Sequence, residues 1–370
     1  PKNHPVSNRA QDIIILSIDG KNREVLMNNK REATRKQQEA SQSLAAEGNK
    51  LLVEKNYKGA AEKLLASVKL NSGDAQTYFL LGYSFLKAGD KKQAYNAFNR
   101  CLAINPGHSR ALFHIAGLSY EIEKGEEAEK YTAQLIKIIE AKLAEYKSVF
   151  QSQRKGRLND KAVETARKMT SLKSNLAQAA YMNGMLAQKR KDYKAAAKAF
   201  EKVAKLQPNS AEAWYRLGIN HMQNKLYHQA TLALEQAVFI RESSLKELSG
   251  DAKRLLDEGL TDEAVEAEIK TRKIKEQMAN SLYMLAVANG RKKESTAALR
   301  NIEKALDIKP DFIQGKYTKA VLLAENSLLD EALEEMRDVL KQCAPNSKEA
   351  RKSIQMITSL MNQIAKRDNP

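Results

Sequence analysis

The chain has 370 residues, enough for two or three globular domains or for one elongated array. A hydrophobic content of 42% suffices for a buried core, while only 7 prolines and 16 glycines favour long helices over sheets. The net charge of +17 excludes no fold, but it favours acidic proteins, nucleic acid or anionic lipid as partners. No apolar run approaches the ~20 residues that span a bilayer, so no membrane-spanning helix is predicted.

Residues 1–40 are predicted to form an N-terminal segment of two parts. The run DIIILSID, Asp12–Asp19, has the character of a single β-strand with no partner strand in the sequence. It is either the remnant of a neighbouring domain or a segment that pairs with something else. Residues 22–40 are charged and helix-prone, and we expect them to continue as a helix into the next part of the chain.

Residues 41–346 follow a period of 34 residues. Counted from residue 41, they form nine repeats, and the twentieth position of every repeat is alanine: Ala60, Ala94, Ala128, Ala162, Ala196, Ala230, Ala264, Ala298 and Ala332. In the seven repeats that fit the pattern best, the eighth position is also small: Gly48, Gly82, Ala116, Gly184, Gly218, Ala286 and Ala320. Small residues let two helices cross closely, and a fixed period of this length indicates a solenoid of helix pairs.

Two repeats, 143–176 and 245–278, fit the pattern poorly but resemble each other. The run RLNDKAVE from Arg157 and the run GLTDEAVE from Gly259 lie 102 residues apart, which is three periods and indicates a triplicated block. Two structures are compatible with these repeats. In the first, they are degenerate repeats in an unbroken solenoid. In the second, their helices fuse with neighbouring helices into long hairpins near 126–190 and 229–290. The bulky Phe150 at the eighth position slightly favours hairpins, which would turn near Gly156–Asn159 and Gly259–Thr261.

Residues 347–370 are predicted to form a capping helix and a tail. The helix runs from Ser347 to about Ala365, with apolar residues on one face (Ile354, Ile357, Leu360 and Ile364). It follows the last repeat, where helical arrays require a capping helix with a polar outer face for solubility.

The repeats resemble the tetratricopeptide repeat family. The resemblance rests on Trp214, Leu217 and Gly218, on Ala230 and Ala237, and on the Ala-x3-Phe pairs Ala94–Phe98 and Ala196–Phe200. It covers 41–346, with seven convincing repeats and two poor ones. It implies an all-α, right-handed superhelical solenoid of about nine helix-turn-helix units, with or without two extended helical hairpins, plus the C-terminal capping helix.

No catalytic set, metal site or cofactor site is predicted, and we expect the chain not to be an enzyme. His221 and His228 lie two helical turns apart, but no carboxylate or cysteine completes a metal site. Neither a Gly-rich phosphate loop nor a G-x-S-x-G turn occurs. Cys101 and Cys343 lie far apart in the sequence and are expected to act as small buried hydrophobes.

The resemblance implies that repeat positions 2, 5, 9 and 12 face a concave groove in which peptides bind. We predict that this groove is lined by Phe79, Tyr83, Phe113, Tyr120, Tyr181, Met185, Tyr215, Ile219, Met222, Tyr283 and Tyr317. Aromatic residues there either anchor a ligand or merely pack. The lysine of the family's chaperone-tail clamp is replaced by Ala45 beside Asn49, so binding of chaperone tails is not expected.

Basic residues gather at repeat positions 13–15, where the first helix of a pair ends. We predict that they form a basic edge: Lys155, Arg157, Lys189, Arg190, Lys191, Arg291, Lys292 and Lys293. The competing explanation is that cations stabilise helix C-termini, by about 0.3–1 kcal/mol each.

The predicted function is that of a non-enzymatic scaffold or adaptor. It would bind protein or peptide segments, acidic ones included, in the groove, with steering by the basic edge. The alternative is a basic solenoid that binds nucleic acid or an anionic membrane surface, which salt would weaken steeply. Self-association is a third possibility. The compartment is not predicted; a cytoplasmic location is favoured, and a secreted protein whose signal peptide was removed is the alternative.

Overall fold

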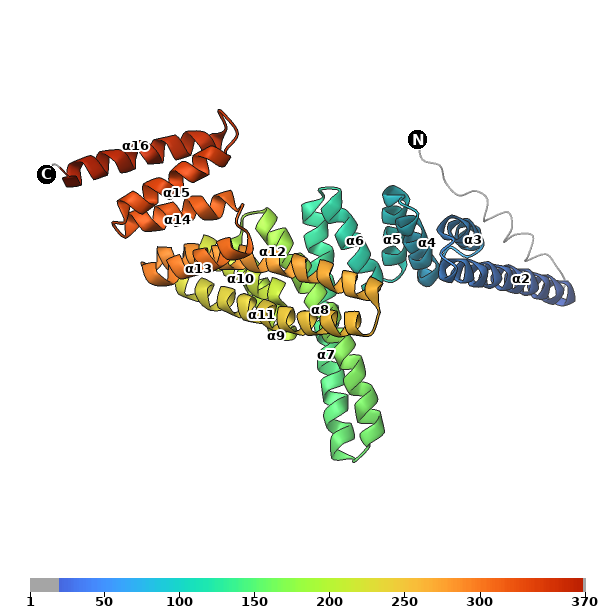
Figure 1. Ribbon diagram of the computed structural model, residues 1–370. Helices are drawn as coiled ribbons and strands as arrows, with labels where there is room; N and C mark the ends of the chain where they lie inside the picture. The colour runs from blue at the N-terminus through green and yellow to red at the C-terminus, as the bar shows by residue number, and fades with distance from the viewer. Residues whose placement is uncertain (1–19, 369–370) are drawn as a thin grey trace. The chain divides into compact units, whose positions relative to one another are not determined.

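The computed structural model describes residues 20–368, and all regular secondary structure in that range is α-helical (Figure 1). The strand-like run Asp12–Asp19 lies outside the described residues. The chain divides into two compact units, one ending at Ile138 and one beginning at Ile139. We call them the N-terminal body and the C-terminal body and describe each by itself.

The N-terminal body consists of short helices paired in sequence order. Its elements are α2 (Gly20–Val53), α3 (Tyr57–Leu70), α4 (Ala75–Lys87), α5 (Lys91–Ile104), α6 (Ser109–Glu121) and the first part of α7 (Gly125–Lys155). Helix starts are fixed by polar side chains, because Asn56, Asp74 and Asp90 each accept a hydrogen bond from a backbone N–H of the first turn. The charged stretch predicted to be helical is part of α2.

The C-terminal body contains the remaining helices and the end of α7. They are α8 (Asn159–Lys189), α9 (Tyr193–Leu206), α10 (Ala211–Gln223), α11 (Tyr227–Asp257), α12 (Thr261–Arg291), α13 (Ser295–Ile308), α14 (Ile313–Glu325), α15 (Leu329–Gln342) and α16 (Lys348–Asp368). The last helix packs on α15 and buries Leu360 completely beside Met336 and Val339. It therefore takes the place predicted for the capping helix.

The core follows the 34-residue period. All nine period alanines are buried, and none is more than 2% exposed. The glycines at the eighth position mark close helix crossings: a Cβ on Gly218 would lie 2.6 Å from Leu234 Cγ, and one on Gly184 would lie 2.8 Å from Phe200 Cζ. The expected solenoid of closely crossing helix pairs is confirmed.

Of the two alternatives for the poor repeats, the structure has the hairpins. Helices α7, α8, α11 and α12 are 31 residues long, whereas the regular first and second helices have 13 and 14 residues. Figure 1 shows α11 beside α12 along their length. Across the other hairpin, Thr165 Oγ1 donates a hydrogen bond to Gln153 Oε1 at 2.8 Å. The turns follow Lys155 and Asp257, as the second alternative requires.

First helices end with a residue in the left-handed backbone conformation. At the end of α8, Lys191 has φ +63°, its N–H donates to the Gln188 carbonyl at 2.9 Å, and the Asp192 N–H donates to the Ala187 carbonyl at 2.9 Å. These two bonds define the Schellman motif, which closes free carbonyls at a helix end. The conformation recurs at Lys55, Glu123, Arg157, Lys225, Lys293 and Ser327.

Lys191→Gly is expected to raise the free energy of unfolding by about 0.5–1 kcal/mol, because glycine adopts a positive φ without steric cost. The matched control is Lys198→Gly in the interior of α9, which should lower it by about 1 kcal/mol. Urea denaturation of both variants gives the comparison. Destabilisation by Lys191→Gly would contradict the assigned helix end.

Candidate protein-interaction surface

The predicted groove residues lie on the first helix of each pair. In the N-terminal body they come from α4 (Phe79 and Tyr83) and α6 (Phe113 and Tyr120). In the C-terminal body they come from α8, α10, α12 and α14 (Tyr181, Met185, Tyr215, Ile219, Met222, Tyr283 and Tyr317). Phe79 is buried, at 4% exposed, and every other member is half-buried. Phe79 is therefore part of the packing beneath the surface and not itself an accessible anchor.

In the N-terminal body these rings surround His114. Its imidazole lies 5.5 Å from the Phe98 ring, 5.6 Å from Tyr83 and 6.1 Å from Phe79, centroid to centroid. The guanidinium of Arg110 covers Phe79 at 4.8 Å. Burial, and after it the positive charges of Lys87 and Arg110, lower the pKa of His114. His114, which sequence reasoning did not single out, thus lies at the centre of an aromatic cluster whose surroundings disfavour the charged imidazolium.

The lowered pKa of His114 predicts a loss of stability in acid. The unfolded chain binds the proton more readily than the folded chain, so stability present above the unfolded pKa of about 6.5 is lost as pH falls below it. We expect the free energy of unfolding to be lower at pH 5 than at pH 7.5, and His114→Phe to reduce that difference. His228→Phe, at an exposed position, is the control. An unchanged pH dependence in His114→Phe would contradict the assignment.

In the C-terminal body two arginines converge on one carboxylate. Arg216 Nε donates to Glu212 Oε1 at 2.7 Å, and Arg241 Nη2 lies 3.4 Å from Glu212 Oε2. Arg216 also donates to Gln188 Oε1 at 3.3 Å, and Arg241 donates to Ser281 Oγ. We call Gln188, Glu212, Arg216, Arg241 and Ser281 the arginine cluster. It joins side chains from α8, α10, α11 and α12.

The arginine cluster lies against the predicted ring positions. The guanidinium of Arg216 lies 5.7 Å from the centre of the Tyr181 ring, and that of Arg241 lies 5.3 Å from the centre of the Tyr215 ring. Both distances are within the range of cation–π attraction. The Tyr181 ring also contacts the Phe200 ring, edge to face at 5.4 Å between centroids. The two tyrosines therefore have fixed positions on this surface.

Arg241 is the unusual member of the cluster. It is 3% exposed, and its Nε has no hydrogen-bond partner. Burial lowers its pKa, opposed by the charge of Glu212 and the Tyr215 hydroxyl. Burial also raises the pKa of the Tyr215 hydroxyl. Two guanidinium groups share one carboxylate here, so the surface keeps an excess of positive charge.

The other predicted groove residues mainly contribute to packing. Met185 contacts the core around Phe200, and Met222 contacts the core around Leu234. Tyr283 lies 5.0 Å from the Phe312 ring, and Tyr317 packs on the core that contains Met336. Each remains half-buried, so each retains a ligand-accessible part.

The predicted basic edge is not continuous. Lys155 and Arg157 lie at the turn of the α7–α8 hairpin, whereas Lys189, Arg190 and Lys191 lie at the opposite end of α8. A 31-residue helix separates the two groups by about 45 Å. Arg291, Lys292 and Lys293 end α12, and Lys292 pairs with Glu294 at 2.9 Å. The prediction of a single strip through all eight residues is therefore wrong. The fused helices place Lys155 and Arg157 at the hairpin turn, far from the other basic residues.

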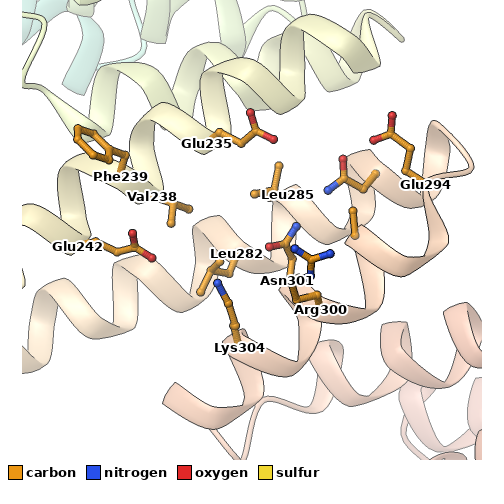
Figure 2. A pocket seen from close by; sticks show the side chains of 12 residues that line it. Glu235, Val238, Phe239, Glu242, Leu282, Leu285, Glu294, Arg300, Asn301 and Lys304 are labelled. Atoms are coloured by element: carbon orange, nitrogen blue, oxygen red, sulfur yellow. The ribbon is translucent and has the colours of Figure 1, made fainter.

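Two grooves that the sequence did not indicate lie between successive second helices. In the N-terminal body a groove of about 550 Å³ runs between α3 and α5 over α4, and its wall includes Leu65, Tyr78 and Phe85. In the C-terminal body a groove of about 300 Å³ runs between α11 and α13 over α12 (Figure 2). Figure 2 shows Glu235 and Glu242 on its α11 side and Arg300 and Lys304 on its α13 side. The second groove is charged, and the first is mostly apolar.

The described residues offer little for covalent or metal chemistry. Among them, no group of three or more His, Cys, Asp or Glu side chains could hold a metal ion. Both cysteines are free, and burial, with a smaller effect of Asp74, raises the pKa of the Cys101 thiol to about 11. In the same part of the chain no helix combines the length and the apolar character needed to cross a membrane.

Family profiles match three parts of the chain. Residues 54–133 match the profile described as anaphase-promoting complex, cyclosome, subunit 3, and residues 181–244 and 279–312 match two profiles described as tetratricopeptide repeat. No curated protein sequence matched the chain significantly.

Several solved structures align with the chain at low identity. A crystal structure of MamA is 16% identical over 54% of this chain and 96% of its own, with a TM-score of 0.42. YrrB, titled a TPR protein with an unusual peptide-binding site, is 15% identical over 69% of this chain and 96% of its own, with a TM-score of 0.45. A tetratricopeptide repeat protein from Parabacteroides merdae is 12% identical over 87% of this chain and 99% of its own, with a TM-score of 0.42. With TM-scores below 0.5, none of these bears on what the chain binds.

Proposed function

Because the chain belongs to the tetratricopeptide repeat family, we propose that it is a non-enzymatic scaffold that binds carboxylate-bearing segments of other proteins through the arginine cluster. Proteins of this family generally act as interaction scaffolds. The location of the binding site and the chemistry of the partner are our inference for this chain. A partner segment would lie across the first helices α8, α10 and α12, beside Tyr181 and Tyr215.

The observation that carries the proposal is the imbalance of charge in the arginine cluster. Glu212 is the carboxylate that faces both Arg216 and Arg241, and the arginines already lie against tyrosine rings. Arg216 is 28% exposed at its side chain, so an incoming Asp, Glu or C-terminal carboxylate can reach it. A guanidinium binds a carboxylate through two parallel N–H donors, which fixes orientation as well as affinity.

The tyrosines would supply the apolar part of the contact. Tyr181 and Tyr215 are half-buried and held in place, so binding costs little side-chain entropy. Rigid aromatic residues of this kind contribute a large share of binding energy at interfaces. The basic residues at the ends of α8 and α12 would attract an acidic partner from a distance.

Selection of displayed random peptides on the wild-type protein tests the proposal. We expect the selected peptides to be enriched in Asp and Glu and to bind Arg216→Gln about tenfold or more weakly. The control is Phe239→Ala, which removes a 62% exposed ring from α11 without touching the cluster. Selected peptides without acidic residues, or unchanged affinity for Arg216→Gln, would contradict the assignment of the site.

A further inference from the structure

The tips of the two long hairpins occupy equivalent places in the triplicated sequence. Residues 152–168 form the turn of the α7–α8 hairpin, and residues 254–270, which lie 102 positions later, form that of the α11–α12 hairpin. Both turns contain a residue with positive φ, Arg157 at +56° and Gly259 at +76°. Both bury the period alanine, Ala162 at 2% and Ala264 at 1% exposed. The two tips therefore share one backbone design.

Their charges are opposite. Residues 152–168 contain six basic and two acidic residues, a net charge of +4, and we call them the basic tip. Residues 254–270 contain two basic and six acidic residues, a net charge of −4, and we call them the acidic tip. Lys155 is replaced by Asp257 at the equivalent position, and Lys161 by Glu263. All four side chains are exposed.

Local helix electrostatics accounts for only part of this pattern, namely for Lys155 in the last turn of α7 and Glu263 in the first turn of α12. A helix N-terminus favours acidic residues and a C-terminus favours basic ones. Lys161 lies in the first turn of α8, and Asp257 is the last residue of α11, so both oppose the dipole of their own helix. Ion pairs made by these tips, Glu164–Lys168 at 2.7 Å and Glu266–Lys270 at 3.3 Å, are within single helices. Neither the helix dipole nor these ion pairs therefore explains why the two tips have opposite net charges.

Each tip also exposes apolar side chains among its charges. Val163 on the basic tip is 52% exposed, and its equivalent on the acidic tip, Val265, is 54% exposed. The acidic tip adds Leu256 at 54% and Ile269 at 53%. An apolar centre with a charged rim is the usual composition of a protein–protein interface. The hairpins leave the C-terminal body in different directions, so the two tips do not cover each other within one chain (Figure 1).

We propose that the basic tip of one copy of this protein docks on the acidic tip of a second copy. The net charges of +4 and −4 are opposite in sign and equal in magnitude, and the exposed valines would meet at the centre of the contact. Because the two surfaces differ, the contact is heterologous and leaves one free tip at each end of the pair. Copies then add head to tail, and the rotation between them decides whether a ring closes or a filament grows.

Sedimentation velocity at low salt tests this with two matched variants. Lys155→Asp/Lys161→Glu brings the basic tip to zero net charge, and Asp257→Lys/Glu263→Lys does the same for the acidic tip. Each variant contains one change that favours the helix dipole and one that opposes it, so folding should be unaffected, as circular dichroism will check. We expect the wild type to associate with rising concentration and each variant to associate at least about tenfold more weakly.

Mixing the two variants gives the decisive readout. The intact acidic tip of the first variant can bind the intact basic tip of the second, and the resulting pair has no further intact tip. We therefore expect a 1:1 dimer that does not grow. Lys194→Asp/Lys198→Glu on α9 makes the same charge change elsewhere and should assemble like the wild type. A wild type that stays monomeric at low salt, assembly that survives both tip variants, or a mixture no larger than its components would overturn the proposal.

Discussion

Replacing Phe200 by alanine is expected to lower the free energy of unfolding by about 3–5 kcal/mol. The ring is 0% exposed and lies on α9 where this helix crosses α8, against the backbone of Gly184. It also supports the Tyr181 ring at 5.4 Å. The neighbouring helices cannot collapse into the space without changing the crossing. Urea denaturation followed by circular dichroism measures the loss, and Phe239→Ala at an exposed position should cost less than about 0.5 kcal/mol.

A double-mutant cycle shows whether Gly184 and Phe200 contribute to stability through the same close helix crossing. Gly184→Leu alone should cost about 1–3 kcal/mol, because a Cβ there would lie 2.8 Å from Phe200 Cζ. In the Phe200→Ala background the same change should cost clearly less, since the added side chain enters the vacated space. Purely additive losses would show that Gly184 and Phe200 do not share the crossing.

The second large effect is a loss of peptide binding without a loss of stability when Arg241 is replaced. We expect Arg241→Ile/Ser281→Ala to unfold with a free energy equal to the wild type or about 1 kcal/mol higher, and to bind acidic peptides at least tenfold more weakly. Replacing a buried charge and its hydrogen-bond partner by apolar residues of suitable shape is often neutral or stabilising, and Glu212 keeps Arg216 as its ionic partner. Here Arg241 is 3% exposed and its Nε has no hydrogen-bond partner.

The chain itself contains the apolar version of this pair. One block earlier, 102 residues before Arg241 and Ser281, stand Ile139 and Ala179, which are 2% and 0% exposed. The equivalent positions therefore accept aliphatic side chains. Urea denaturation and titration with the selected peptides give the two readouts. A strongly destabilised double variant, or one that binds acidic peptides normally, would show that Arg241 is structural and not part of a binding site.

The repeat architecture could be predicted because its physical requirement is local. Two helices of a regular pair approach each other near positions 8 and 20, where small residues allow a close crossing, so the alanine series from Ala60 to Ala332 marks the repeats. The apolar face of residues 347–365 predicted the capping helix, whereas the 34-residue period left open whether the poor repeats form hairpins. Phe150 slightly favoured the hairpins, but the paths of α7, α8, α11 and α12 are what distinguish the two structures.

The arginine cluster could not be predicted, because it depends on that path. A regular second helix ends at repeat position 30, as α9 does at Leu206. In α11 the helix continues, so Arg241 at position 31 becomes a buried helical residue instead of a loop residue. Fusion of helices also separated Lys155 and Arg157 from the other basic residues. The ring positions came from the family resemblance, and their role in binding stays a prediction.

The central claim, that partners bind the first-helix face, is tested most directly by affinity capture from an extract of the source cells. The bait proteins are the wild type, Tyr181→Ala/Tyr215→Ala, and Lys189→Glu/Arg190→Glu/Lys191→Glu, each with and without nuclease. We expect the wild type to retain specific proteins in both conditions and the tyrosine variant to lose them, while the charge variant captures them more slowly. Capture that depends on the charged residues and disappears with nuclease would contradict the account and identify a nucleic-acid-binding surface.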